Sequence, residues 1–178
     1  MRRPIVGVIG SGQNEHANLA PELGRWLAAK GVHLLTGGGL GVMSSVSRAF
    51  YETPHRKGLV IGVLPSRPDD PQRRPWPGYP NPWVELPITT HLPLSGAQGT
   101  QPMSRNHINV LTSEALIILP GGEGTLSEVT LALRYQRPII AYLQKPSDFP
   151  GLPAEVPLTH TLAGLDEFLS RHIKLEDH

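Results

Sequence analysis

An arginine and a glutamate stand on either side of one apolar run, and a group of glycines separates the glutamate from that run. Arg105 precedes the run at residues 116–119, and Glu128 follows the glycine segment at residues 121–124. A guanidinium can hold a phosphate through two parallel N–H groups. A carboxylate can accept hydrogen bonds from a ligand, or it can act as a general base. The pattern therefore predicts a site for a small phosphorylated molecule.

Glycine turns follow three of the apolar runs, at residues 10–12, 37–41 and 121–124. Free N–H groups in such turns, and the positive end of a following helix dipole, favour an anion. The carboxyl ends of parallel strands meet at one edge of a sheet, so we expect the three turns to share one ligand. The residues predicted to bind it are Gly10, Ser11, Gly12, Gly37, Gly38, Gly39, Leu40, Gly41, Arg105, Asn106, Gly121, Gly122, Glu123, Gly124, Thr125 and Glu128.

The two charged side chains also have a structural interpretation. Arg105 is expected in the first turn of the helix before the central strand, and Glu128 in the first turn of the helix after it. They could face the anion site together, or they could simply form an ion pair with each other. A contact with the helix dipole is a further alternative for Glu128. Asn106 could bind the polar edge of a ring, or cap its own helix.

Several other kinds of site are excluded by the sequence. The first glycine turn has Glu15 where a dinucleotide fingerprint needs its third glycine, and no Gly-Lys-Ser/Thr motif for a nucleoside triphosphate occurs. The eight histidines form no HExxH motif and no tight cluster, so no metal site is predicted. No Gly-x-Ser-x-Gly surrounds Ser95 or Ser104, and neither is predicted to be a nucleophile.

The elements that must position these residues alternate between strands and helices. Apolar runs predict strands at residues 5–9, 32–36, 59–64, 116–119 and 138–143, and a short further strand could lie at residues 83–89. Apolar residues at helical spacing predict helices between them and a last helix at residues 162–173. Ser104 is predicted to cap the helix that carries Arg105, and Thr125 to begin the helix that carries Glu128. The alternation predicts an α/β, Rossmann-like fold with a doubly wound parallel sheet flanked by helices.

The segment at residues 66–82 does not fit this alternation. It is rich in proline and contains three arginines and two aromatic residues, so it is neither a helix nor a central strand. A long ordered loop at the carboxyl end of a strand often forms one wall of a binding site. A solvent-exposed insertion is the alternative.

The bulk composition sets further limits. The chain has 178 residues, which predicts a single domain spanning residues 1–178. The net charge of +1 predicts no broad surface for nucleic acid. The absence of cysteine excludes disulfides and thiolate metal sites. The apolar run near the amino terminus is too short for a signal peptide or a membrane span, so we expect a cytoplasmic protein.

Three motifs together resemble a known superfamily. They are the glycine-rich stretch at residues 36–43, the Ser-Arg-Asn triplet at residues 104–106, and Pro-Gly-Gly-Glu-Gly-Thr-Leu-Ser-Glu at residues 120–128. They are similar to the Rossmann-like superfamily once labelled "lysine decarboxylase-like", and the similarity runs from about Ile5 to Leu143. One branch of that superfamily, the Lonely Guy phosphoribohydrolases, cleaves nucleoside 5′-monophosphates with an arginine and the motif glutamate.

The second branch, the molybdenum cofactor carrier proteins, is the one that the chain resembles more. The phosphoribohydrolases have lysine after their arginine, whereas the carriers have the Arg-Asn pair that occurs here as Arg105-Asn106. The resemblance implies a homo-oligomer, a dimer or tetramer, that stores molybdenum cofactor for molybdenum enzymes. Under the phosphoribohydrolase alternative, Arg105 and Glu128 would be catalytic. A nucleotide-sensing module without turnover is a third alternative.

Overall fold

Parallel strands form one sheet at the centre of the molecule. The computed structural model describes residues 2–174, so both ends of the predicted domain lie outside the described residues. The strands are β1 (Ile5–Ile9), β2 (His33–Thr36), β3 (Val60–Leu64), β4 (Leu86–Thr89), β5 (Ala115–Ile118), β6 (Ile139–Tyr142) and β7 (Leu158–Thr159). Their order in the sheet is β4-β3-β2-β1-β5-β6-β7, and every pair is parallel. The predicted α/β fold with a doubly wound parallel sheet is confirmed.

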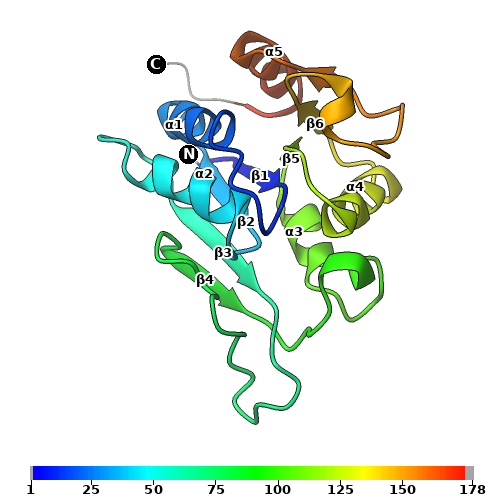
Figure 1. Cartoon of the computed structure of the whole chain (residues 1–178). Coiled ribbons are helices and arrows are strands. Elements are labelled where there is room, and N and C mark those ends of the chain that lie inside the picture. The colour runs from blue at the N-terminus through cyan, green and yellow to red at the C-terminus, as the bar shows by residue number, and fades with distance from the viewer. Residues whose placement is uncertain (1, 175–178) are drawn as a thin grey trace.

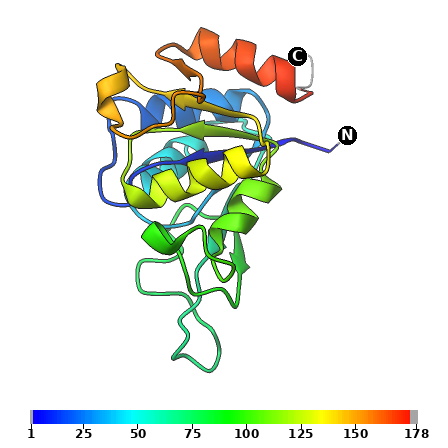
Figure 2. The same ribbon diagram turned by 90° about the vertical axis from the view of Figure 1, so that its right-hand side faces the viewer.

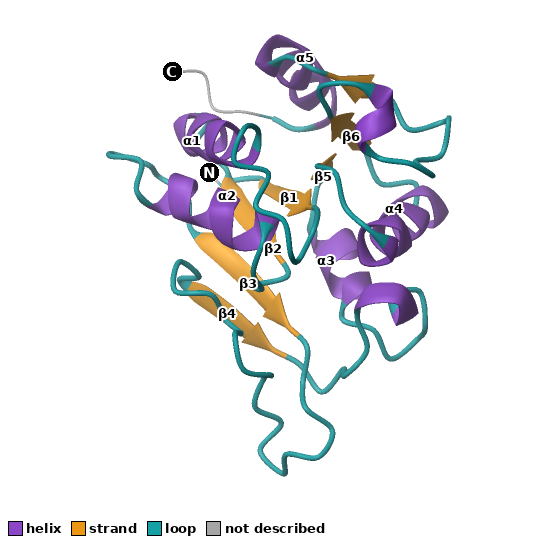
Figure 3. Ribbon diagram, viewed as in Figure 1, coloured by secondary structure: helices purple, strands orange, loops and turns teal. Residues whose placement is uncertain are grey.

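Helices cover both faces of this sheet (Figures 1 and 2). One face carries α1 (Ala20–Ala29), α2 (Val42–Tyr51) and α5 (Leu162–His172), and the other carries α3 (Asn106–Thr112) and α4 (Glu123–Arg134). Two short 3₁₀ helices, η1 (Gly96–Gln98) and η2 (Pro146–Asp148), lie in the connections. Figure 3 shows that long loops join these elements, above all between β3 and β4.

The apolar runs form strands because both of their faces are buried. Along β5, Ile117 faces the core under α1, α2 and α5, whereas Leu116 and Ile118 face the core under α4. All three side chains are fully buried. A strand whose side chains point alternately to the two faces of the sheet, and are apolar at every position, is typical of the centre of a parallel sheet. This explains why the run shows no alternation of apolar and polar residues.

The glycine turns after β1, β2 and β5 meet where the strand order reverses, between β1 and β5. The Ser11 N–H donates to the Pro120 carbonyl at 3.1 Å, and the Val42 N–H at the start of α2 donates to the Ser11 carbonyl at 2.8 Å. Backbone hydrogen bonds therefore connect the turn after β1 both to the start of α2 and to the turn after β5. Ligands of doubly wound folds bind at this reversal of the strand order.

Some predicted boundaries differ from the structure. The two-residue strand β7 was not among the predicted strands, because it follows prolines and is too short to show a pattern. The predicted cap at Ser104 is wrong by one residue: Arg105 is the N-cap of α3, although Ser104 Oγ accepts the Asn106 N–H at 3.1 Å. Helix α4 begins at Glu123 and not at Thr125, which places Glu128 in its second turn. No helix of residues 2–174 is long and apolar enough to cross a membrane.

Gly41 provides a test of how tightly the turns are packed together. Its φ is +61°, and a Cβ at this position would lie 2.3 Å from the Ser11 carbonyl oxygen. We predict that Gly41→Ala lowers the free energy of unfolding by roughly 2–4 kcal/mol, from strain at positive φ together with overpacking. Denaturant unfolding measures this change.

Gly78→Ala is the matched control for that substitution. Gly78 also has a positive φ, of +89°, but an added Cβ would meet nothing within 4 Å. We expect a loss of only about 1 kcal/mol there, from backbone strain alone. Equal losses for the two variants would show that the turns are not packed as described.

Candidate functional site

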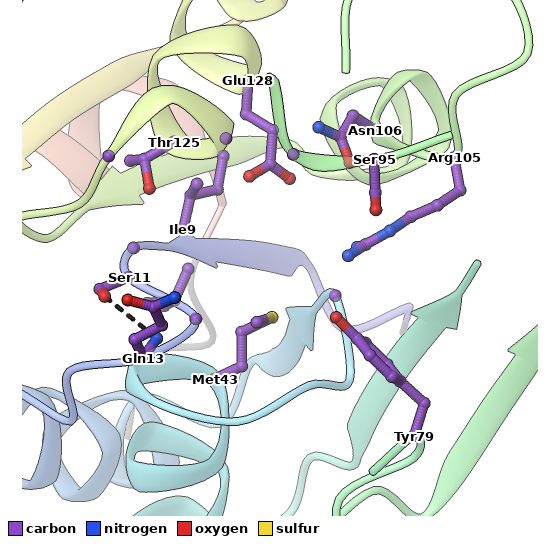
Figure 4. A pocket seen from close by; sticks show the side chains of 17 residues that line it. Ile9, Ser11, Gln13, Met43, Tyr79, Ser95, Arg105, Asn106, Thr125 and Glu128 are labelled. Atoms are coloured by element: carbon purple, nitrogen blue, oxygen red, sulfur yellow. Dashed lines mark hydrogen bonds between the residues drawn. The ribbon is translucent and has the colours of Figure 1, made fainter. Parts of the chain in front are cut away.

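A cavity of about 370 Å³ opens at the reversal of the strand order, between the carboxyl ends of β1 and β5. Figure 4 shows its side chains converging from the strands, from α2, α3 and α4, and from the loop before β4. The cavity is lined by Val8, Ile9, Gly10, Ser11, Gly12, Gln13, Gly37, Met43, Tyr79, Ser95, Gly96, Arg105, Asn106, Gly122, Gly124, Thr125 and Glu128.

The N-terminus of α4 forms one end of the cavity. The N-cap residue Gly122 provides no side-chain cap, and the first N–H groups of a helix have no partner within the helix. Thr125, in the first turn, and Gly124 line the cavity at this end. Across from them, Ser11 Oγ accepts the Gln13 and Asn14 N–H groups at 3.1 and 2.9 Å, which fixes the turn after β1. Helix N–H groups and the helix dipole make this end suited to an anion.

Arg105 provides a positive charge on the other side of the cavity. Its side chain extends inward from the start of α3, opposite Thr125 (Figure 4). The residue is only 5% exposed, and its Nε and Nη1 atoms are buried without a hydrogen-bond partner among the described residues. An added Cβ at Gly37 would lie 2.1 Å from Nη1, so the guanidinium packs directly on the backbone of the turn after β2. A buried and unsatisfied guanidinium is costly unless an anion binds to it.

Glu128 lies between these two ends and points its carboxyl group into the cavity (Figure 4). Asn109 Nδ2 donates a hydrogen bond to Glu128 Oε1 at 2.9 Å. Burial raises the pKa of the Glu128 carboxyl above its ordinary value, although the Arg105 charge and the Asn109 hydrogen bond act in the opposite direction. The alternative of a direct Arg105–Glu128 ion pair is not realised among the described residues. Both side chains are therefore available to a ligand.

Asn106 connects the two helices that carry these charges. It is 2% exposed, and its Nδ2 donates to Ser127 Oγ of α4 at 3.1 Å. Ser127 Oγ in turn donates toward the carbonyl oxygens of Gly96, at 3.1 Å, and Gly124, at 2.8 Å. The side chain thus does not cap its own helix. It holds α3, α4 and the Ser95–Gly96 loop together around the cavity.

Some of the residues predicted to bind the ligand lie outside the cavity wall. After Gly37 the chain bends away, and Asn81 binds the carbonyl oxygens of Gly38 and Gly39 at 2.7 and 2.8 Å. Leu40 is 57% exposed. The residues outside the wall are Gly38, Gly39, Leu40, Gly41, Gly121 and Glu123, and those within it are Gly10, Ser11, Gly12, Gly37, Arg105, Asn106, Gly122, Gly124, Thr125 and Glu128.

The sequence did not point to several residues of the wall. Tyr79 comes from the segment at residues 66–82, for which a wall of the site was one of two alternatives, and Asn81 attaches this segment to the turn after β2. Ser95 and Gly96 were not predicted to line the site, and Gly96 has a φ of +60°. Gln13 and Met43 follow glycine turns but carry no motif. Within residues 2–174, no group of three or more His, Asp or Glu side chains could hold a metal ion.

A cavity at the reversal of a doubly wound parallel sheet lies where proteins of the Rossmann-like class bind small molecules. The chain belongs to the SLOG cluster4 family, whose model matches residues 3–156. A relative in Archaeoglobus fulgidus, an uncharacterized protein, is 32% identical over 136 residues, which cover 75% of this chain and 76% of that one.

Solved structures of molybdenum cofactor proteins resemble this fold over nearly the whole chain. The molybdenum cofactor binding protein of the phototrophic bacterium Rippkaea orientalis is 32% identical, with a TM-score of 0.75 over 98% of this chain and 99% of that one. The molybdenum cofactor carrier protein of Chlamydomonas reinhardtii is 30% identical, with a TM-score of 0.68 over 96% of this chain and 98% of that one. The predicted resemblance to the carrier branch is confirmed.

The raised pKa of Glu128 predicts how stability changes with pH. A carboxyl group whose pKa is higher in the folded than in the unfolded protein costs stability as the pH rises through those two values. We predict that Glu128→Gln has a higher Tm than the wild type at about pH 7.5, and that this advantage disappears below about pH 4. Thermal unfolding across this pH range measures the difference.

The exposed Glu155 provides the control for this prediction. Glu155→Gln should unfold like the wild type at every pH, because that carboxyl group lies outside the cavity. A Glu128→Gln variant that is stabilised only at acid pH would contradict the assigned direction of the pKa.

Proposed function

We propose that this protein binds molybdenum cofactor, and that it stores and protects the cofactor before transfer to molybdenum enzymes. The cofactor is a pyranopterin with a terminal phosphate and a dithiolene that already ligates molybdenum. The observation that carries the proposal is the cavity with an uncapped helix N-terminus at one end and the unsatisfied Arg105 guanidinium at the other. The likeness to two cofactor-binding proteins at about 30% identity supports it.

The two ends of the cavity suit different parts of this cargo. We place the phosphate at the N-terminus of α4, against Gly122, Gly124 and Thr125. Arg105 lies on the opposite side, so it would bind a second negative charge, at the dithiolene end. Glu128 would accept a hydrogen bond from the pterin ring or donate one to it. This differs from the interpretation of the sequence in which residues 37–41 and 121–125 hold one phosphate and Arg105 counters its charge.

The proposal also covers the oligomeric state of the protein, its compartment and its partners. We infer a homo-oligomer, a dimer or tetramer, that works in the cytoplasm and passes its cargo to molybdenum enzymes, as the resemblance to the carrier branch implies. The chain contains no cysteine, so no thiolate competes with the dithiolene for molybdenum. Neither nucleic acid nor a membrane is a partner in this proposal.

A nucleoside 5′-monophosphate phosphoribohydrolase is the second candidate. The position of Arg105 and Glu128 around one cavity favours it, because cleavage of an N-glycosidic bond needs a charged group beside the ribose. In that reaction Arg105 would orient the nucleotide, and Glu128 would stabilise the positive charge that develops or would activate water. A nucleotide-sensing module would bind the same ligands without turnover.

Binding of the cofactor is the direct test of the proposal. We expect the purified wild type, incubated anaerobically with released molybdenum cofactor, to retain molybdenum and a pterin that fluoresces after oxidation. Arg105→Ala should raise the Kd about tenfold or more, because it removes charge-assisted hydrogen bonds in a buried site. Arg134→Ala, at an exposed arginine of α4 outside the cavity, is the control and should bind like the wild type.

Turnover of AMP distinguishes the two candidates. For a carrier we expect no release of adenine from AMP or from adenine-type cytokinin monophosphates, by the wild type or by Glu128→Ala. Release of free base by the wild type that is lost in Glu128→Ala would overturn the carrier as the main function. Failure to retain molybdenum and pterin from a cofactor-replete preparation would count against it independently.

A further inference from the structure

The loop between β3 and β4 carries a second hollow that the proposed function does not use. Figures 1 and 2 show this loop projecting away from the sheet and its helices. The hollow measures about 370 Å³ and is lined by Arg67, Arg74, Pro75, Trp76, Pro77 and Tyr79. Tyr79 also lines the main cavity, so the two sites share one wall.

A buried carboxylate gives the loop its fixed shape. Asp70 is 2% exposed, and its Oδ2 accepts hydrogen bonds from Arg67 Nη2 and Arg74 Nε, each at 2.7 Å. Its Oδ1 accepts the Gln72 N–H at 2.8 Å. Burial acts to raise the pKa of Asp70, but these hydrogen bonds outweigh it and hold the pKa below its ordinary value. The carboxylate therefore stays ionised at neutral pH and orders the loop from within.

The arginines that hold Asp70 leave positive charge for a ligand. Two guanidinium groups share one carboxylate, which gives the cluster a net charge of about +1. Arg74 binds Asp70 through Nε alone, so both of its Nη groups lack a protein partner within the described residues. The Arg67 Nε is buried without a hydrogen-bond partner in the same part of the chain. Two parallel Nη–H groups of an arginine match the oxygens of a phosphate.

An aromatic ring lies beside this charge. Trp76 lines the hollow and is 44% exposed, although large aromatic side chains are usually well buried. The Arg67 guanidinium lies 5.9 Å from the centre of the Trp76 ring. An indole that is held by a cation and partly open to solvent can stack on a planar heterocycle. Trp76 and Arg74 line the same hollow, and a planar ring joined to a phosphate is the basic form of a nucleotide.

We propose that this hollow is a binding site for a nucleoside monophosphate, whose base stacks on Trp76 and whose phosphate binds Arg74. The ligand is either a free mononucleotide or the nucleotide part of a larger molecule. The site is separate from the predicted anion site at α4, and it stands whether or not the main cavity holds molybdenum cofactor.

The test follows Trp76 directly in the full chain. The indole N–H signals of Trp26, Trp76 and Trp83 are recorded by NMR, and the Trp76 signal is assigned from its loss in Trp76→Phe. We expect AMP to shift the Trp76 signal to saturation, with a Kd about tenfold higher in Arg74→Gln because a charge-assisted contact to phosphate is lost. Arg73→Gln is the matched control: it is the neighbouring arginine, does not line the hollow, and should leave the Kd unchanged.

Further titrations distinguish a nucleotide site in this hollow from binding of a phosphate alone, of a base alone, or of AMP in the main cavity. Inorganic phosphate and adenosine should each bind more weakly than AMP, because each supplies only half of the contacts. A dinucleotide such as NAD tests whether the ligand is a larger molecule that contains a nucleotide. A lower Kd for NAD than for AMP would show that the site binds the nucleotide part of such a molecule. In Arg105→Ala the AMP shift should persist, because Arg105 lines only the main cavity. An AMP shift of Trp76 that never saturates, or that is the same in Arg74→Gln, would overturn the proposal.

Discussion

The buried guanidinium of Arg105 is the constraint on which the site depends. It packs against the backbone of Gly37 so closely that any side chain there would displace it, and its Nε and Nη1 atoms have no partner among the described residues. A charge in this position is held by the packing of α3 on the sheet, not by a neighbouring acid. Glu128, the nearest candidate, is bound by Asn109 instead and has a raised pKa. The fold therefore keeps a buried positive charge in the cavity wall without an ion-pair partner among the described residues, which is costly unless an anion binds to it.

The topology of the sheet explains why the opposite end of the cavity also favours an anion. The strand order reverses between β1 and β5, and the turns after these two strands line the cavity. Helix α4 starts there with a glycine that cannot cap it, and its first N–H groups remain unsatisfied by side chains. Asn106 then fixes the distance between α3 and α4 through Ser127. Two groups that favour an anion, the helix N-terminus and Arg105, are thus held apart on opposite sides of one cavity.

A feature of the fold or of the site could be predicted from the sequence where neighbouring residues in the chain determine it, and could not where distant residues do. Strands such as Ala115–Ile118 and the turn at Gly122 are local patterns, and they allowed the fold to be predicted and the glycine turns to be assigned to one edge of the sheet. The direction of the backbone after Gly37 is not local. It is set by Asn81, which is far along the chain and binds Gly38 and Gly39, so the later glycines of that turn could not be separated from Gly37 in advance. Tyr79 reaches the cavity through the same anchor, although its proline-rich surroundings show no periodicity.

The protonation of Glu128 bears on whether the cavity binds or transforms its ligand. An oxocarbenium-like transition state needs a carboxylate that is ionised beside the sugar. Here burial disfavours the ionised form, and the net effect remains a raised pKa even though Arg105 and Asn109 oppose it. A neutral carboxyl group instead offers one hydrogen-bond donor and one acceptor, which matches the edge of a heterocyclic ring. A raised pKa makes this carboxyl group easier to protonate, and the protonated form suits recognition of a ring more than stabilisation of a developing positive charge.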